Sequence, residues 1–139
     1  MTNSVLISSE SRYPINRRRI RQKVKKYLED LGIDEAEVSV AIVGSRKMRE
    51  LNRKWRHQDE PTTVLTFALE EPRDARGILR IGDIVISYPE ARAIAQEDQL
   101  SMDEAIEKLL VHGLKNLLKN QKNGNDFLSQ TSAPKLSGS

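Results

Sequence analysis

The sequence contains no cysteine, which excludes disulfide bonds, iron–sulfur clusters and any zinc site built from thiolates. Histidine is also scarce, because His57 and His112 are the only two in the chain. No apolar run approaches the roughly 18 residues of a membrane-spanning helix. The N-terminus lacks the basic segment and apolar stretch of a signal peptide. These absences predict a cytoplasmic protein without a membrane partner.

The chain has 139 residues, of which 37% are hydrophobic and 31% are charged. A chain of this length normally forms one domain and can bury a core without support from disulfides. The apolar content is too high for a protein that is disordered throughout. We therefore expect a single charge-rich globular domain.

Charge is distributed unevenly, although the formal net charge is only +3. Residues 12–26 hold eight basic side chains and no acid, and residues 46–56 hold six basic side chains and only Glu50. Residues 59–110 are mainly acidic, with twelve acids and five bases. Because no acid lies at helical spacing to pair with the cluster at 12–26, we expect one basic face that binds a polyanion. The alternative is that these side chains form solvated helix faces.

Hydrophobic periodicity and breaker residues predict four strands and four helices. The expected strands are 4–8, 37–43, 62–67 and 78–87, and the expected helices are 15–31, 45–55, 89–95 and 101–119. Ser45 is the expected N-cap of the second helix, and Ser101 with Glu104 predicts a capping box at the fourth. Since 62–67 and 78–87 look like a hairpin, the order predicts an α+β domain with a small mixed sheet of about four strands packed with helices.

Three segments, in the same order and spacing, resemble the YbeY family of bacterial rRNA-maturation endoribonucleases. The first segment consists of residues 51–56 (LNRKWR) and residues 61–67 (PTTVLTF). Residues 51–56 are similar to the family pattern Leu-Asn-x-x-aromatic-Arg. After a polar loop, residues 61–67 are similar to the family pattern Pro-Thr-(Asp/Asn)-Val-Leu-Ser-Phe. The second is 81–87 (IGDIVIS), and the third is 111–114 (VHGL), where the family begins its metal motif. The resemblance covers about residues 3–122.

The resemblance implies a zincin-like YbeY fold in a single domain, 1–122, and we expect residues 123–139 to form a disordered tail because they are rich in Ser, Gly, Asn and Gln. It also implies a metal-dependent single-strand endoribonuclease that acts in rRNA processing. The implied partners are rRNA or other single-stranded RNA, together with the small ribosomal subunit and assembly factors. The RNA-binding residues that we expect from the basic segments are Arg17, Arg18, Arg19, Arg21, Lys23, Arg53 and Lys54.

The zinc motif of the family, His-Gly-x-x-His-x-x-Gly-x-Asp-His, is incomplete in this chain. His112 occupies the first ligand position, but Asn116 and Lys122 stand where the family has its second and third histidines. Lys119 replaces the glycine that ends the helix, so the turn toward the third ligand is also in question. One imidazole and one amide fall short of a zinc shell, and we expect this chain to bind zinc poorly.

The remaining site residues have alternative interpretations. His112 lies well away from the apolar stripe of its helix, so it faces either solvent or a cleft. By resemblance, Arg56 contacts a phosphate, although an arginine at a helix end also interacts with the terminal carbonyls. Thr62 and Thr63 either donate hydroxyls to the same phosphate or are strand formers, and we favour the strand for Thr63. Asp83 either orients the His112 ring or holds a turn of its strand.

Two functions therefore remain. The first is a metal-dependent endoribonuclease with an altered metal shell, and the second is a catalytically inactive RNA- or ribosome-binding factor that keeps the fold and the basic face. The incomplete histidine set is the only sequence feature that separates them, and it favours the second.

Overall fold

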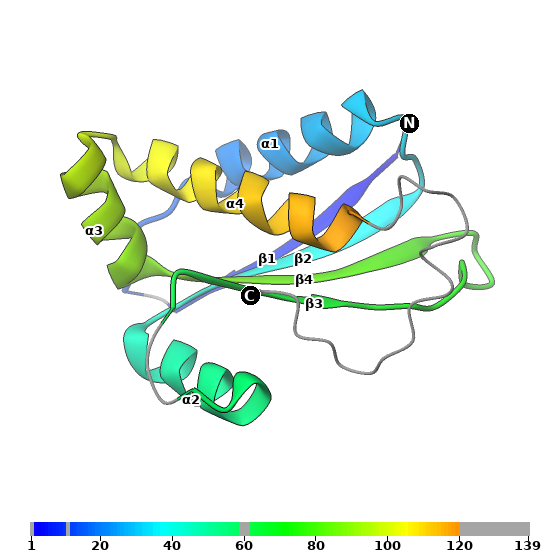
Figure 1. Ribbon diagram of the computed structural model, residues 1–139. Coiled ribbons are helices and arrows are strands. Elements are labelled where there is room, and N and C mark those ends of the chain that lie inside the picture. The colour runs from blue at the N-terminus through cyan, green and yellow to red at the C-terminus, as the bar shows by residue number, and fades with distance from the viewer. Residues whose placement is uncertain (1, 11, 59–61, 120–139) are drawn as a thin grey trace.

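The computed structural model describes residues 2–10, 12–58 and 62–119, and this part of the chain forms four strands and four helices (Figure 1). In chain order they are β1 (Ser4–Ser9), α1 (Arg17–Asp30), β2 (Ala36–Val43), α2 (Ser45–Arg56), β3 (Val64–Ala68), β4 (Leu79–Ser87), α3 (Tyr88–Asp98) and α4 (Met102–Leu118). Every element expected from the sequence is present, and the bounds differ by a few residues. The expected tail, 123–139, and the expected domain end at residue 122 lie outside the described residues.

The four strands form one mixed sheet in the order β1-β2-β4-β3. β1 and β2 are parallel, β2 and β4 are parallel, and β3 runs antiparallel to β4. The expected α+β class with a mixed sheet is therefore confirmed. Gly82 adopts a φ of +150° beside a register shift between Glu37 and Val38, and a Cβ atom at this position would collide with the Phe67 carbonyl oxygen. Only glycine fits where β3 and β4 approach so closely.

The two faces of the sheet are covered very differently. Helices α1, α3 and α4 pack on one face, and side chains such as Val24, Ile84 and Leu110 form the main core there. Helix α2 lies on the opposite face (Figure 1), where Met48 packs with Leu65 and Val85 in a smaller cluster. Since α2 is short, it covers only part of this face.

Local details at two element boundaries differ from the expectations. Gly44, rather than Ser45, is the N-cap of α2, and it makes no side-chain cap bond. Its backbone N–H donates to Glu10 Oε2 at 2.8 Å, so a side chain distant in sequence fixes the start of the helix. Thr62 and Thr63 precede β3, which begins only at Val64. The Thr63 carbonyl accepts a bond from the Ser87 N–H, but the strand interpretation of Thr63 is wrong.

Helix α4 lies unusually close to the sheet because Gly113 has no side chain. A Cβ atom at this position would lie 2.9 Å from Ile84 Cγ2 and 3.3 Å from Thr66 Cγ2. Such distances leave no room for a methyl group without displacing the helix or the strands. Gly113 therefore determines how far the adjacent residue, His112, lies from the sheet.

The outer edge of the sheet at β1 is partly closed by a side chain from α1. Arg17 Nη1 donates to the Ile7 carbonyl oxygen at 2.8 Å. In the described part of the chain, β1 pairs only with β2, so this carbonyl would otherwise have no partner in the sheet. Arg17 thus satisfies one acceptor on an exposed strand edge.

Candidate functional site

Helix α4 positions the histidine and asparagine of the incomplete metal motif. Its N-terminus is fixed by a capping box, in which the Ser101 hydroxyl accepts from the Glu104 N–H and the Glu104 carboxylate accepts from the Ser101 N–H. His112 is exposed and Asn116, one turn further along, is half-buried. Because residues four apart lie on the same side of a helix, the two side chains are neighbours.

His112 lines a hollow of about 540 Å³ between α4 and the segment that leads into β3. Thr63, Lys108 and Lys115 are also among its lining residues. His112 is exposed to solvent and also lines this open hollow, so both alternatives for its surroundings apply in part. Lysine, threonine and histidine side chains together line a hollow that favours an anion such as a phosphate.

Sequence reasoning missed Lys108 and Lys115, although a signal was present. Lys108 precedes His112 by four residues and Lys115 follows it by three, and both spacings place side chains on one side of a helix. Lys108 also forms an ion pair with Asp98, with Nζ and Oδ2 3.0 Å apart. Lys108 therefore both lines the hollow and pairs with an acid of α3.

The residues at this site do not fit a zinc ion. Within residues 2–10, 12–58 and 62–119, no group of three or more His, Cys, Asp or Glu side chains could hold a metal. The buried Nδ2 atom of Asn116 has no hydrogen-bond partner among the described residues, and an amide nitrogen offers no lone pair to a cation. Lys119 has a right-handed helical conformation, with φ −59° and ψ −28°, so the chain makes no glycine-type turn there. Lys122 lies outside the described residues.

Arg56 does not share the hollow beside His112. It is half-buried at the last position of α2, on the face of the sheet opposite α4 (Figure 1). His57 follows in a left-handed conformation, with φ 59°, and ends the helix. The expected phosphate contact of Arg56 therefore belongs to the α2 side of the sheet, next to Arg53 and Lys54.

Asp83 also lies on the α2 face and does not orient the His112 ring. It belongs to β4 and pairs in register with Ser39 of β2, and the Ser39 hydroxyl donates to its carboxylate. Burial raises the pKa of Asp83, and the Ser39 bond and the charge of Arg80 only partly oppose this shift. Of the two expectations, the one that coupled Asp83 to His112 is wrong, because strand alternation turns its side chain away from α4.

The basic cluster on α1 is engaged with acids more than expected. Arg19 makes a two-pronged contact with Glu107 of α4, with Nε–Oε2 2.7 Å and Nη2–Oε1 3.1 Å, and its Nη1 atom lies 3.5 Å from Asp103 Oδ2. Lys26 pairs with Asp30 at i,i+4 spacing. Lys23 lines a hollow together with Glu104 and Glu107. The expectation that no acid lies at helical spacing to pair with the cluster was wrong for Lys26, and the acids of α4 add partners that helical spacing does not reveal.

The two basic segments do not form one continuous face. Residues 17–26 belong to α1, on the same side of the sheet as α4, whereas residues 46–56 belong to α2 on the opposite side (Figure 1). Helix α1 connects the parallel strands β1 and β2 on one face, whereas α2 connects β2 to the antiparallel edge strand β3 on the other face. Our expectation of a single polyanion face is thus wrong, and the charge is divided between two surfaces.

No helix in the described part of the chain combines the length and the apolar character that a membrane crossing requires. This finding agrees with the hydropathy of the sequence.

The fold and the site define an α+β protein in which one mixed sheet separates a hollow lined by His112 and lysines from the basic helix α2. Comparison with known proteins identifies the family. The sequence model of Endoribonuclease YbeY matches residues 6–119, so the chain belongs to the YbeY family.

Curated relatives named Endoribonuclease YbeY include proteins from three bacteria. The protein from Persephonella marina is 38% identical over 117 residues, which span 84% of this chain and 76% of the relative. An Anaeromyxobacter protein is 40% identical over 118 residues, which span 83% of this chain and 59% of the relative. The protein from Aquifex aeolicus is 35% identical over 116 residues, which span 84% of this chain and 75% of the relative. A solution structure from Thermotoga maritima is similar in fold, with a TM-score of 0.54, 22% identity, and coverage of 90% of this chain and 89% of the other.

Proposed function

We propose that this chain acts in rRNA maturation as an endoribonuclease of single-stranded RNA, working in the cytoplasm with the small ribosomal subunit and assembly factors. The observation that carries the proposal is the family match over 6–119, which includes all three motif segments. The chemistry of the hollow supports it, because Lys108 and Lys115 attract a phosphate and His112 can hydrogen-bond one of its oxygens. Arg56 supplies a planar guanidinium for a second phosphate on the α2 side.

The basic side chains of α1 and α2 would hold a long RNA at two separate places. Arg18 is exposed on α1, and Arg53 and Lys54 are exposed in the last turn of α2. An rRNA segment is long enough to pass around the sheet and contact both helices. Arg17, Arg21 and Lys23 extend the α1 surface.

A second function is favoured by one observation. Asn116 offers only a neutral amide oxygen at its ligand position, and no group of three or more His, Cys, Asp or Glu side chains among the described residues could hold zinc. A protein that keeps the fold and the cationic surfaces but binds no metal would bind RNA or the ribosome without cleaving it. The zinc of the family is therefore doubtful in this chain.

Metal content and RNA cleavage, measured on the same preparation of the full chain, test the two functions. We expect well under one equivalent of zinc by elemental analysis, and we expect RNA binding that weakens in Arg56→Glu. Cleavage that disappears in His112→Ala, with folding intact by circular dichroism, would establish the endoribonuclease. RNA binding without any cleavage would establish the binding factor, and a full equivalent of zinc would refute the poor-metal expectation.

A gain-of-metal variant provides the matched control. Asn116→His, Lys119→Gly and Lys122→His together restore the residues of the family motif, and we expect metal occupancy to rise. The single change Lys115→His adds an imidazole outside the motif positions, and we expect no comparable rise. Equal occupancy in the two variants would show that the C-terminal backbone does not follow the family.

A further inference from the structure

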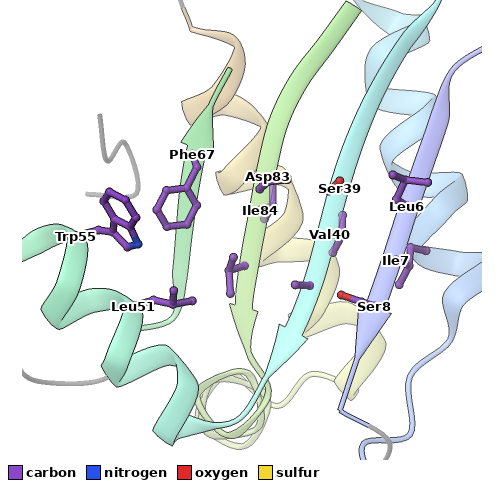
Figure 2. Close-up of a pocket in the computed structure, with 12 residues that line it drawn as sticks. Leu6, Ile7, Ser8, Ser39, Val40, Leu51, Trp55, Phe67, Asp83 and Ile84 are labelled. Atoms are coloured by element: carbon purple, nitrogen blue, oxygen red, sulfur yellow. The ribbon is translucent and has the colours of Figure 1, made fainter. Parts of the chain in front are cut away.

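The sheet carries a second hollow on its α2 face, away from His112 (Figure 2). Its volume is about 540 Å³, which is within the range of small-molecule sites. Strands β1, β2, β4 and β3 form its floor, and α2 forms one wall. It is open because α2 covers only the part of the face near Met48 and Leu65.

The floor contains one row of side chains that crosses all four strands. Leu6 of β1 pairs in register with Ser39 of β2, Ser39 pairs with Asp83 of β4, and Asp83 pairs with Phe67 of β3. Directly paired residues on one face have Cβ atoms roughly 5 Å apart, so the row places the hydroxyl and carboxylate between two apolar ends. Asp83 is thus a hydrogen-bonding group surrounded by an otherwise apolar surface.

The wall of the hollow is aromatic. Trp55 of α2 and Phe67 of β3 lie edge to face, with ring centroids 6.2 Å apart and an interplanar angle of 71°. Trp55 is the only tryptophan in the chain and is 37% exposed. Leu6, at the other end of the row, is 54% exposed. Large apolar side chains exposed around a polar centre are typical of a binding surface.

The helix that forms the wall of the hollow ends in basic side chains. The last turn of α2 carries Arg53, Lys54 and Arg56, and Lys54 Nζ lies 5.1 Å from the centroid of the Trp55 ring. Aromatic rings beside positive charges are the usual means by which proteins bind single-stranded nucleic acids, because bases stack while cations attract the backbone. The positive charge at the end of α2 therefore complements a polyanion rather than an apolar peptide.

We infer that this hollow is a subsite for one unpaired guanine base of single-stranded RNA. The base stacks on the Phe67 ring, with the Trp55 ring against its side, and its Watson–Crick edge faces Asp83. Guanine presents two N–H donors on that edge, N1–H and the N2 amino group, which a carboxylate can accept together. Ser39 holds the carboxylate in place, and the basic end of α2 binds the adjacent phosphates.

Guanine fits the polar centre better than the other bases. Uracil presents one N–H donor between two carbonyl oxygens, and those oxygens would face the carboxylate unfavourably. Adenine and cytosine each present one amino group beside an acceptor nitrogen. Burial raises the pKa of Asp83 despite the Ser39 hydrogen bond, so further donors from a bound base would favour its ionised form. The inference rests on the proposed RNA function, and it adds a base preference at a place distinct from the His112 hollow.

Fluorescence of Trp55 tests the inference without any cleavage assay. The full chain is titrated with the tetraribonucleotides UUGU, UUAU, UUCU and UUUU, and emission of its single tryptophan is followed. We expect UUGU to quench emission and to bind about tenfold more tightly than the other three. Phe67→Ala should weaken UUGU binding about tenfold, and Phe67→Tyr, which keeps the ring, should restore it. Asp83→Asn should remove the preference for guanine.

Matched controls separate this subsite from general RNA binding. Glu97→Gln removes a carboxylate on an exposed part of α3 and should leave the guanine preference intact. Equal affinity for the four oligonucleotides, while a long rRNA fragment still binds in a His112-dependent manner, would overturn the inference and leave the proposed function standing. Absence of binding to any RNA would overturn both. A dimer that dissociates in Phe67→Ala, with no base preference in the parent, would assign the face to a second copy and overturn the inference.

Discussion

Asp83 is a carboxyl group placed among apolar strand residues, and its raised pKa makes the stability of the protein depend on pH. The folded chain holds this proton more tightly than the unfolded chain, whose aspartate pKa is about 3.9. Between the two pKa values the folded state binds more protons, so the free energy of unfolding declines as pH rises through this window. The ionised Asp83 carboxylate therefore destabilises the folded state at neutral pH. It lies at the surface that we assign to binding.

Urea denaturation across this pH window measures the effect. We expect Asp83→Asn to lack the decline, so that its stability relative to the parent increases from acid toward neutral pH. Ser39→Ala is the companion variant, because it removes the hydrogen bond that lowers the pKa of Asp83 and should extend the decline to higher pH. Parallel pH profiles for the parent and Asp83→Asn would contradict the assignment.

The sequence predicted the part of the site that depends on local spacing, but it could not predict the contacts that depend on the tertiary structure. The motif spacing placed His112 and Asn116 side by side, because helical periodicity is a local property. The surroundings of Asp83 could not be predicted in the same way, because the face to which a strand residue points depends on the register of the whole sheet. The ion pair of Arg19 could not be predicted from local sequence either, because its partner Glu107 lies 88 residues further along the chain.

At the scale of single elements, α4 depends on the cap at its N-terminus. The reciprocal bonds of Ser101 and Glu104 satisfy backbone groups that a helix leaves without partners. We expect Ser101→Ala to lower the free energy of unfolding by about 1 kcal/mol, measured by urea denaturation. Glu104→Gln should lose much less, because an amide oxygen can still accept the Ser101 N–H. An equal loss in both variants would place the effect outside the cap.

The order and type of elements were predictable, whereas two of their ends were not. Hydrophobic periodicity identified all eight elements, because each buries one side against the sheet or the helices. Thr62 and Thr63 have the β-branched character of a strand, but the register with β4 begins at Val64 and Ile86, and Thr63 adds only the bond of its carbonyl to the Ser87 N–H. The Gly44 N–H donates to the Glu10 carboxylate instead of to a capping side chain nearby in the sequence. Such a long-range bond cannot be predicted from the residues near α2.

At the scale of the whole molecule, the sheet separates two cationic surfaces. The lysines near His112 and the basic side chains of α1 lie on one side, and the last turn of α2 lies on the other (Figure 1). A short oligonucleotide seated on α2 cannot reach α1 through the sheet. A long rRNA segment can contact both surfaces by passing around an edge.

Salt titrations of RNA affinity test this division. Binding should weaken steeply with salt, and each lost phosphate contact should reduce the slope of log K against log salt by about 0.7. With a tetraribonucleotide, Arg53→Gln and Lys54→Gln should reduce the slope, whereas Arg18→Gln on α1 should leave it unchanged. With a long rRNA fragment, all three changes should reduce it. A slope for the tetraribonucleotide that falls with Arg18→Gln would show that the surfaces are continuous.

The contact between Arg17 and the Ile7 carbonyl affects how the molecules behave toward one another in solution. An unshielded strand at the margin of a sheet can recruit a strand from another molecule and start aggregation. A bulky, charged guanidinium seated on β1 makes that recruitment unfavourable. We therefore expect Arg17, one of the arginines assigned to RNA from the sequence, also to oppose the association of molecules through β1.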